Sequence, residues 1–94
     1  MTSIDDNVAL EAISLVAGDR QHDYGHYSIN MRNIATAWIG VTGNYHSAAD
    51  VARMLAAMKI VRAAHRYKRD NYVDAIAYLL IAESLDNPDG TQTQ

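Results

Sequence analysis

Hydrophobic residues recur along the chain at the three- and four-residue spacing typical of α-helices, and this spacing predicts four helical segments. One proline and five glycines leave long stretches uninterrupted, so a many-turned β architecture is not expected. The expected helices run from about Asp6 to Ala17, from about Ser28 to Ile39, from a Ser47 cap to about Arg66, and from an Asp70 or Asn71 cap to about Leu85. The pattern therefore predicts an all-α fold, a compact bundle of four short helices.

The third expected helix has an apolar face with cations along its edge. Met54, Met58 and Val61 share one stripe at helical spacing, and His65 continues it, so we expect this stripe to be core. Trp38 and Met31, on the second helix, are also expected in the core. The cations Lys59, Arg62 and Arg66 lie beside the stripe, where their aliphatic stems can follow the core while their charged heads meet at one point.

The fourth expected helix carries acids in line with its apolar residues. Asp70 and Asp74 share a stripe with Tyr78 and Ile81, so these carboxylates are expected to point inward or into a cleft. A second apolar strip on this helix is more surface than one neighbour can cover, and it predicts that self-association completes the bundle. Its members are Tyr72, Ile76, Leu79 and Leu80.

Composition narrows the class of protein. The chain has 94 residues, of which 49% are apolar and 20% charged, so we expect one domain over residues 1–94, ordered from about 5 to 87 with a frayed C-terminal tail. A net charge of −3 gives no basis for bulk nucleic-acid binding. The absence of cysteine, of a signal peptide and of a long apolar run favours a soluble cytoplasmic protein with no membrane contact.

Opposite charges gather where the third helix ends and the fourth begins. Five of the eight Lys and Arg residues fall between Lys59 and Arg69, and Asp70, Asn71 and Asp74 follow directly. Such a corner can hold a phosphate, bind a metal, or pair its own charges. A polar, aromatic loop before the second helix adds further candidates, namely Arg20, Asp23, Tyr24 and Tyr27.

Each of these groups also has a purely structural interpretation. Asp70 and Asp74 can serve as a cap and a first-turn acid of the fourth helix. The cations beside them can form surface ion pairs, which are worth about 0 to 1 kcal/mol each. Asp23, Tyr24 and Gly25 can form a simple turn.

Taken together, these motifs resemble those of small phage and prophage proteins of unassigned function, over roughly residues 10 to 85. The resemblance is carried by a D-Y-G loop at Asp23, a K-x-x-R helix at Lys59 and a D-N-x-x-D-x-x-x-Y helix from Asp70 to Tyr78. The same order is similar to the bacterial and phage nucleotide modification associated domain, and more distantly to MazG-type nucleoside triphosphate pyrophosphohydrolases. The resemblance implies a MazG-like helical domain acting on nucleotides in the host cytoplasm.

The acids depart from the MazG pattern. Those enzymes hold magnesium between an E-x-x-E helix and an E-x-x-D helix, whereas here Asp70 and Asp74 stand four residues apart and the first helix offers only Glu11. Magnesium needs only one or two carboxylates together with substrate phosphates, so Asp70 and Asp74 stay candidate metal ligands. Whether the protein is an enzyme is left open by this incomplete set.

Three functions follow. The first is a phage-type protein that binds a nucleotide or another phosphorylated small molecule, either in nucleotide metabolism or to sequester a nucleotide signal of host defence. The second is a magnesium-dependent nucleoside triphosphate pyrophosphohydrolase, and the third is a non-enzymatic protein that binds a host partner. The candidate ligand-binding residues are Arg20, Asp23, Tyr24, Tyr27, Lys59, Arg62, Arg66, Asp70, Asn71, Asp74 and Tyr78.

Overall fold

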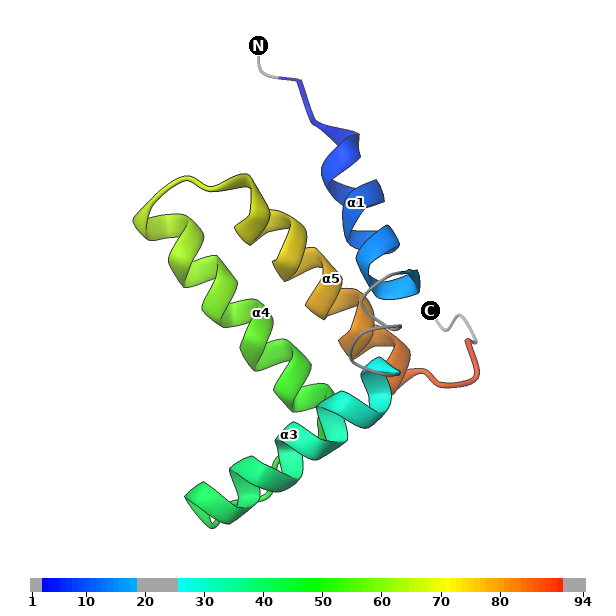
Figure 1. Cartoon of the computed structure of the whole chain (residues 1–94), viewed down its shortest axis with the longest axis vertical. Helices are drawn as coiled ribbons and strands as arrows, with labels where there is room; N and C mark the ends of the chain where they lie inside the picture. The colour runs from blue at the N-terminus through cyan, green and yellow to red at the C-terminus, as the bar shows by residue number, and fades with distance from the viewer. Residues whose placement is uncertain (1–2, 19–25, 91–94) are drawn as a thin grey trace.

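A computed structural model of the chain describes residues 3–18 and 26–90. These residues form four α-helices and contain no strand, which confirms the expected all-α fold for the described part of the chain (Figure 1). The helices are α1 (Asp6–Ala17), α3 (Tyr27–Thr42), α4 (Ala48–His65) and α5 (Arg69–Asp86).

Local hydrogen bonds explain where three of the helices begin or end. The Asp5 carboxylate accepts a hydrogen bond from the Asn7 backbone N–H at 3.0 Å, which caps α1. The predicted capping box of α4 is present, because the Asp50 N–H donates to the Ser47 hydroxyl at 3.0 Å and the Asp50 carboxylate accepts from the Ser47 N–H. Gly43, with φ at 74°, ends α3 in the left-handed conformation that favours glycine.

Two predicted boundaries differ from the structure. The helix α3 continues three residues past Ile39, because Gly40 lies inside it and only Gly43 ends it. The helix α5 begins at Arg69 after Lys68, so the prediction that Asp70 or Asn71 caps it was wrong. Both residues lie in the first turn of α5, and no side chain caps its N-terminus.

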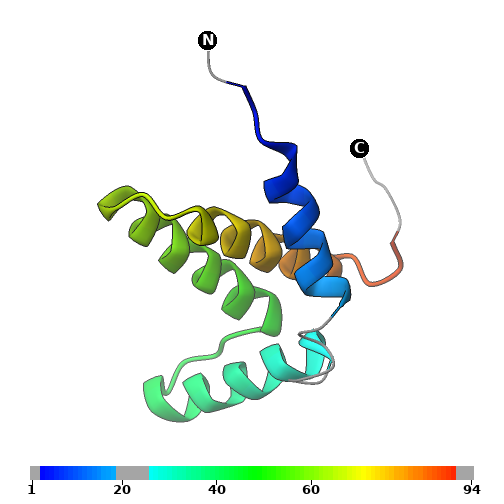
Figure 2. The same cartoon turned by 45° about the horizontal axis from the view of Figure 1, so that its top comes forward.

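An antiparallel pair of helices, α4 and α5, forms the centre of the fold (Figure 1). Residues 66–68 join the two helices in a short turn. The helix α1 packs against α5, whereas α3 packs mainly against α4 near its N-terminal end (Figure 2). The far end of the pair, where the joining turn lies, is therefore away from α3.

Small side chains make up most of the core. One cluster lies where α3, α4 and α5 meet, and a second, smaller cluster joins α1 to α5. Val51 and Val73 are the largest fully buried side chains among the described residues. The first cluster contains Met31, Ala35, Val51, Ala52, Ile81 and Ala82, and the second contains Ala12, Val73 and Ala77.

The buried face of α4 is not the one that the large apolar residues predicted. Met54 and Met58 are 47% and 43% exposed, Val61 is 69% exposed, and His65 is also exposed. The buried face instead carries Ala49, Val51, Ala52 and Ala56. Alanine lets two helix backbones approach closely, so α5 packs on the alanine face and the methionines are left outside. Met31 is buried as predicted, and Trp38 is partly buried against the first cluster.

The second apolar strip of α5 is largely uncovered. Tyr72, Leu79 and Leu80 are 48%, 49% and 38% exposed, whereas Ile76 packs against the cluster shared with α1. Among the described helices, none is both long enough and apolar enough to cross a lipid bilayer.

Candidate functional site

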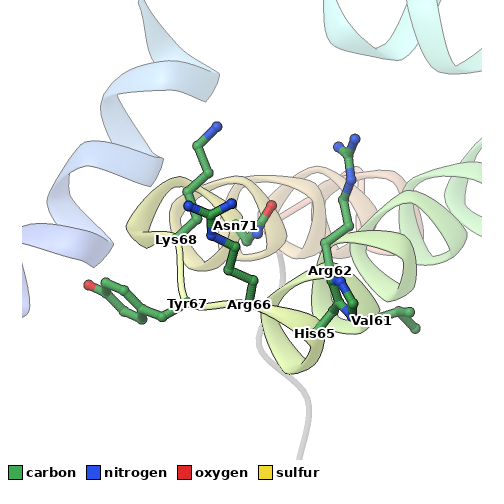
Figure 3. Close-up of a pocket in the computed structure, with 7 residues that line it drawn as sticks. All are labelled: Val61, Arg62, His65, Arg66, Tyr67, Lys68 and Asn71. Carbon is green, nitrogen blue, oxygen red and sulfur yellow. The ribbon is translucent and has the colours of Figure 1, made fainter.

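The turn between α4 and α5 is flanked by two hollows. The larger has a volume of about 720 Å³ and the smaller about 260 Å³. The larger, drawn in Figure 3, is lined by Val61, Arg62, His65, Arg66, Tyr67, Lys68 and Asn71. The smaller is lined by Lys59, Arg62, Lys68, Asp70, Asn71 and Asp74.

Three residues line both hollows, and each comes from a different part of the hairpin. Arg62 lies in the last turn of α4, Lys68 precedes α5, and Asn71 lies in the first turn of α5. Figure 3 shows the side chains of Arg62, Arg66 and Lys68 extending to the same side of the turn, with Asn71 between them. The two hollows therefore share a cationic boundary.

One predicted cation is already paired. The Lys59 ammonium lies 2.9 Å from the Asp74 carboxylate, and both side chains are only 15% exposed. By contrast, Arg62, Arg66 and Lys68 form no ion pair with any residue of the described ranges 3–18 and 26–90. The positive charge that is free to meet a ligand therefore lies at the turn rather than at Lys59.

Helix dipoles explain some of these cations and not others. Arg62 lies in the last turn of α4, where a cation is favourable. Lys68 lies at the N-terminus of α5, where the helix dipole favours an anion instead. Arg69 shares this unfavourable position, but it forms ion pairs with Glu11 of α1 and with Asp5, which precedes α1. The hydrogen bond to Glu11 raises the pKa of Arg69. Lys68 has no such compensation in the described structure.

Asn71 is a buried polar residue at the boundary of the hollows. It is only 8% exposed, and its side-chain amide makes no hydrogen bond with another described residue. Its backbone N–H donates to the Lys68 carbonyl at 3.0 Å. No described side-chain nitrogen or oxygen is both buried and without a hydrogen-bond partner, so the Asn71 amide reaches solvent through the hollows that it lines and is available to a ligand there.

The sequence-predicted residues fall into three groups. Lys59, Arg62, Arg66, Asp70, Asn71 and Asp74 are brought together around the two hollows. Tyr27 and Tyr78 are not, because both pack against the cluster shared by α3, α4 and α5. Arg20, Asp23 and Tyr24 lie outside the described residues, so their predicted roles stay predictions.

Four residues that line the larger hollow were absent from the predicted set. They are Val61, His65, Tyr67 and Lys68. Their signal in the sequence is position, because they fall in the last turn of a basic helix or in the short turn that follows it. Val61 and His65 were instead assigned to the core, where the structure does not place them.

The described residues offer few ligands for the predicted magnesium ion. No group of three or more His, Asp or Glu side chains there could hold a metal ion, and the Asp74 carboxylate is already paired with Lys59. Asp70 is exposed and lies at the edge of the smaller hollow. The pair Asp70 and Asp74 therefore does not by itself form a metal site, and magnesium stays a prediction.

The structure thus defines a small helical protein with a cationic turn at one end. The chain belongs to a family whose description is a domain of unknown function (DUF6378), and the family model matches residues 7–86. It is similar to the "Gene 55 protein" of Mycobacterium phage D29, with 34% identity over 74 residues, which is 78% of this chain. The chain spans about half the length of that relative, since the match covers 49% of it. No solved structure matches the chain.

Proposed function

We propose that this protein binds a nucleotide or another phosphorylated small molecule at the turn between α4 and α5. The observation that carries the proposal is the unpaired Lys68 at the uncapped N-terminus of α5, next to Arg62 and Arg66. A cation at this helix end is unfavourable unless an anion joins it, and an anion here would also meet the positive end of the helix dipole. Arginine and lysine are the side chains best suited to phosphate.

The phage relative supports a role in an infected cell. A phage protein of this kind can act in nucleotide metabolism, or it can sequester a nucleotide signal made by host defence. The predicted roles of Arg20, Asp23 and Tyr24 belong to the same proposal, with Tyr24 stacking on a base. The similarity to the nucleotide modification associated domain and to MazG-type enzymes, and action in the host cytoplasm, are part of the proposal as well.

Magnesium-dependent hydrolysis of a nucleoside triphosphate is the second candidate. It is favoured by Asp70, whose exposed carboxylate makes no ion pair in the described structure and lies at the edge of a hollow lined by cations. A magnesium ion bridging this carboxylate and substrate phosphates would need few protein ligands. Release of pyrophosphate from a triphosphate with magnesium, and its loss in Asp70→Asn, tests this candidate.

We also propose that the protein self-associates through the apolar residues exposed on α4 and α5. The exposed residues there include Met54, Met58, Leu79 and Leu80, which are 47%, 43%, 49% and 38% exposed. Leu79→Arg should convert an oligomer to a monomer in sedimentation velocity, whereas Val41→Arg, at an exposed position on α3, should not. If the wild type sediments as a monomer, the self-association proposal is wrong. The uncovered apolar surface would then favour the alternative that the protein binds a host partner.

Calorimetric titration of the full chain tests the main proposal. The panel comprises inorganic phosphate, pyrophosphate, AMP, ATP and the uncharged nucleoside adenosine. Phosphorylated compounds should bind and adenosine should not. Arg62→Gln and Lys68→Gln should each weaken binding at least about 10-fold, the value of one charge-assisted hydrogen bond. Arg32→Gln is the matched control, because Arg32 is exposed on α3 and makes no ion pair in the described structure.

Unchanged affinity in Arg62→Gln and Lys68→Gln would remove the turn as the binding site. Equal losses in the Arg32 control would mean that the contact is diffuse attraction to positive charge rather than a site.

A further inference from the structure

The two hollows share one boundary but differ in chemistry on either side of it. The boundary consists of Arg62, Lys68 and Asn71, which line both hollows. On one side the smaller hollow adds carboxylates, and on the other side the larger hollow adds an apolar side chain and two rings. A ligand that fills both hollows must therefore have a central anion and two different flanking groups.

The boundary is the natural place for a phosphate. Arg62 and Lys68 supply positive charge without a partner among the described residues, and the uncapped N-terminus of α5 adds backbone N–H groups. Asn71 adds a hydrogen-bond donor, because its side-chain amide lines both hollows and makes no hydrogen bond with another described residue. A phosphate oxygen at the boundary can accept a hydrogen bond from the Asn71 amide.

The smaller hollow does not suit a second phosphate. Asp70 and Asp74 line it, and although Lys59 neutralises Asp74, the Asp70 carboxylate has no described ion-pair partner. A further negative group placed there would be repelled by Asp70. A carboxylate readily accepts hydrogen bonds from hydroxyl groups, and a volume of about 260 Å³ corresponds to roughly nine water molecules. The smaller hollow therefore suits a neutral, hydroxyl-rich group such as a sugar.

The larger hollow suits a nucleoside. Its volume of about 720 Å³ falls within the range of ordinary small-molecule sites. Val61 supplies an apolar surface, and the rings of His65 and Tyr67 also line this hollow. Tyr67 is 74% exposed, and its ring centroid lies 6.3 Å from that of Tyr72. The exposed ring surface is open to a base.

We propose that the ligand is a phosphodiester, with a nucleoside in the larger hollow, its phosphate on Arg62, Lys68 and Asn71, and the second sugar in the smaller hollow. This proposal rests on the proposed function, because it requires that the turn binds a phosphorylated molecule. It adds that the phosphate is internal, carrying a group on each side, rather than terminal.

The phosphodiester proposal predicts tighter binding of a dinucleoside monophosphate than of a mononucleotide, whereas charge alone predicts the opposite order. AMP carries close to two negative charges at neutral pH, whereas the dinucleoside monophosphate ApA carries one. A cationic cluster without a second compartment would therefore bind AMP more tightly than ApA. The proposed arrangement predicts that ApA binds about 10-fold more tightly than AMP in calorimetric titration of the full chain.

Two substitutions separate the compartments. Asp70→Asn should weaken the binding of ApA about 3- to 10-fold, because it removes a carboxylate that accepts a hydrogen bond from a hydroxyl group. It should strengthen the binding of ADP, because it removes the repulsion of a second phosphate. Tyr67→Ala should weaken ApA and AMP by the same factor of about 5, because both place a base in the larger hollow. Asp89→Asn and Tyr45→Ala are matched controls at exposed positions outside both hollows, and both should leave all affinities unchanged.

Asn71→Asp tests the boundary without changing side-chain size. An acid in the first turn of α5 is favourable for the helix, so the variant should keep its helicity in circular dichroism. It should nevertheless lose ApA binding by more than about 10-fold, because the new charge faces the phosphate.

Binding of AMP at least as tight as ApA would overturn the phosphodiester proposal while leaving the proposed function intact. So would a loss of ADP binding in Asp70→Asn. If no phosphorylated compound binds at all, the proposed function fails, and the phosphodiester proposal fails with it.

Discussion

The ion pair between Lys59 and Asp74 should stabilise the hairpin more than any exposed ion pair between described residues. It joins the middle of α4 to the first half of α5, beneath the turn that carries the free cations. Replacing Asp74 with Asn leaves the Lys59 ammonium in a largely buried position without its counter-charge. The expected result is a substantial loss of stability with the helical content of the folded state preserved.

The magnitude follows from distance and burial. At 2.9 Å and an effective dielectric constant of about 20, the attraction is about 6 kcal/mol before desolvation is subtracted. Removing one partner of a fully buried pair destabilises by about 3 to 5 kcal/mol, and exposed pairs contribute about 0 to 1 kcal/mol. With both side chains 15% exposed, we expect about 2 kcal/mol for Asp74→Asn, equivalent to a fall in Tm of about 8 to 16 °C.

A double-mutant cycle measures the pair directly. Urea unfolding of the wild type, Lys59→Met, Asp74→Asn and the double variant gives the coupling free energy, which we expect at about 1.5 kcal/mol. A parallel cycle on Arg53 and Asp86, whose side chains are 45% and 56% exposed, should give a smaller coupling. A coupling below about 0.5 kcal/mol at Lys59 and Asp74 would refute the reasoning, because it would match a fully solvated pair.

Three further predictions concern other parts of the fold. Gly43→Ala should destabilise the protein by about 1 kcal/mol in urea unfolding, because φ is 74° there. Gly40→Ala should stabilise it by about 0.5 to 1 kcal/mol, because Gly40 lies inside α3 and an added Cβ would meet no neighbouring atom within 4 Å. Hydrogen bonds from Arg53 and Ser47 hold the pKa of Asp50 below its ordinary 3.8. These bonds therefore stabilise the folded state above about pH 4, and this stabilisation is lost as the pH falls through the lowered pKa. Asp50→Asn should flatten this part of an acid-unfolding curve. Arg69→Ala should speed hydrogen exchange in α1 and leave α3 unchanged, because it removes the ion pairs to Glu11 and Asp5.

Helix positions were largely predictable because their signals are local. The acids before α1 and the Ser47 capping box are short-range patterns, and the structure begins both helices where these patterns predict. The start of α5 was missed because it has no side-chain cap, so nothing in the sequence marks Lys68 as the boundary. The end of α3 was missed because two glycines compete, and only Gly43 adopts a positive φ.

Which face of each helix is buried was harder to predict. On α4, Met54 and Met58 are the largest apolar side chains of their face, yet the buried face carries Ala52 and Ala56, and Ala52 lies in the cluster shared with α5. Helical periodicity ranks faces by hydrophobicity, whereas close packing of two backbones depends on small size. The same error affected the candidate site, since Val61 was assigned to the core and instead lines the larger hollow.

The charged corner was predictable as a cluster but not in its pairing. The sequence indicated that cations from one helix would meet acids from the next, and six of the predicted residues do line the hollows. Which cations stay free depends on distances across the hairpin. Lys59 reaches Asp74, whereas Lys68 lies in the turn and reaches no described acid.

The side chains buried along α4 and α5 are mostly alanines, whose single methyl groups have no rotamers to exchange. Helices that meet through such a surface have few alternative packings, because a change of spacing cannot be absorbed by turning a longer side chain. The hairpin should therefore be rigid, and the two backbones should fix the distance between Arg62 and Asn71. This fixed distance would then select ligands by their length before their chemical groups are recognised.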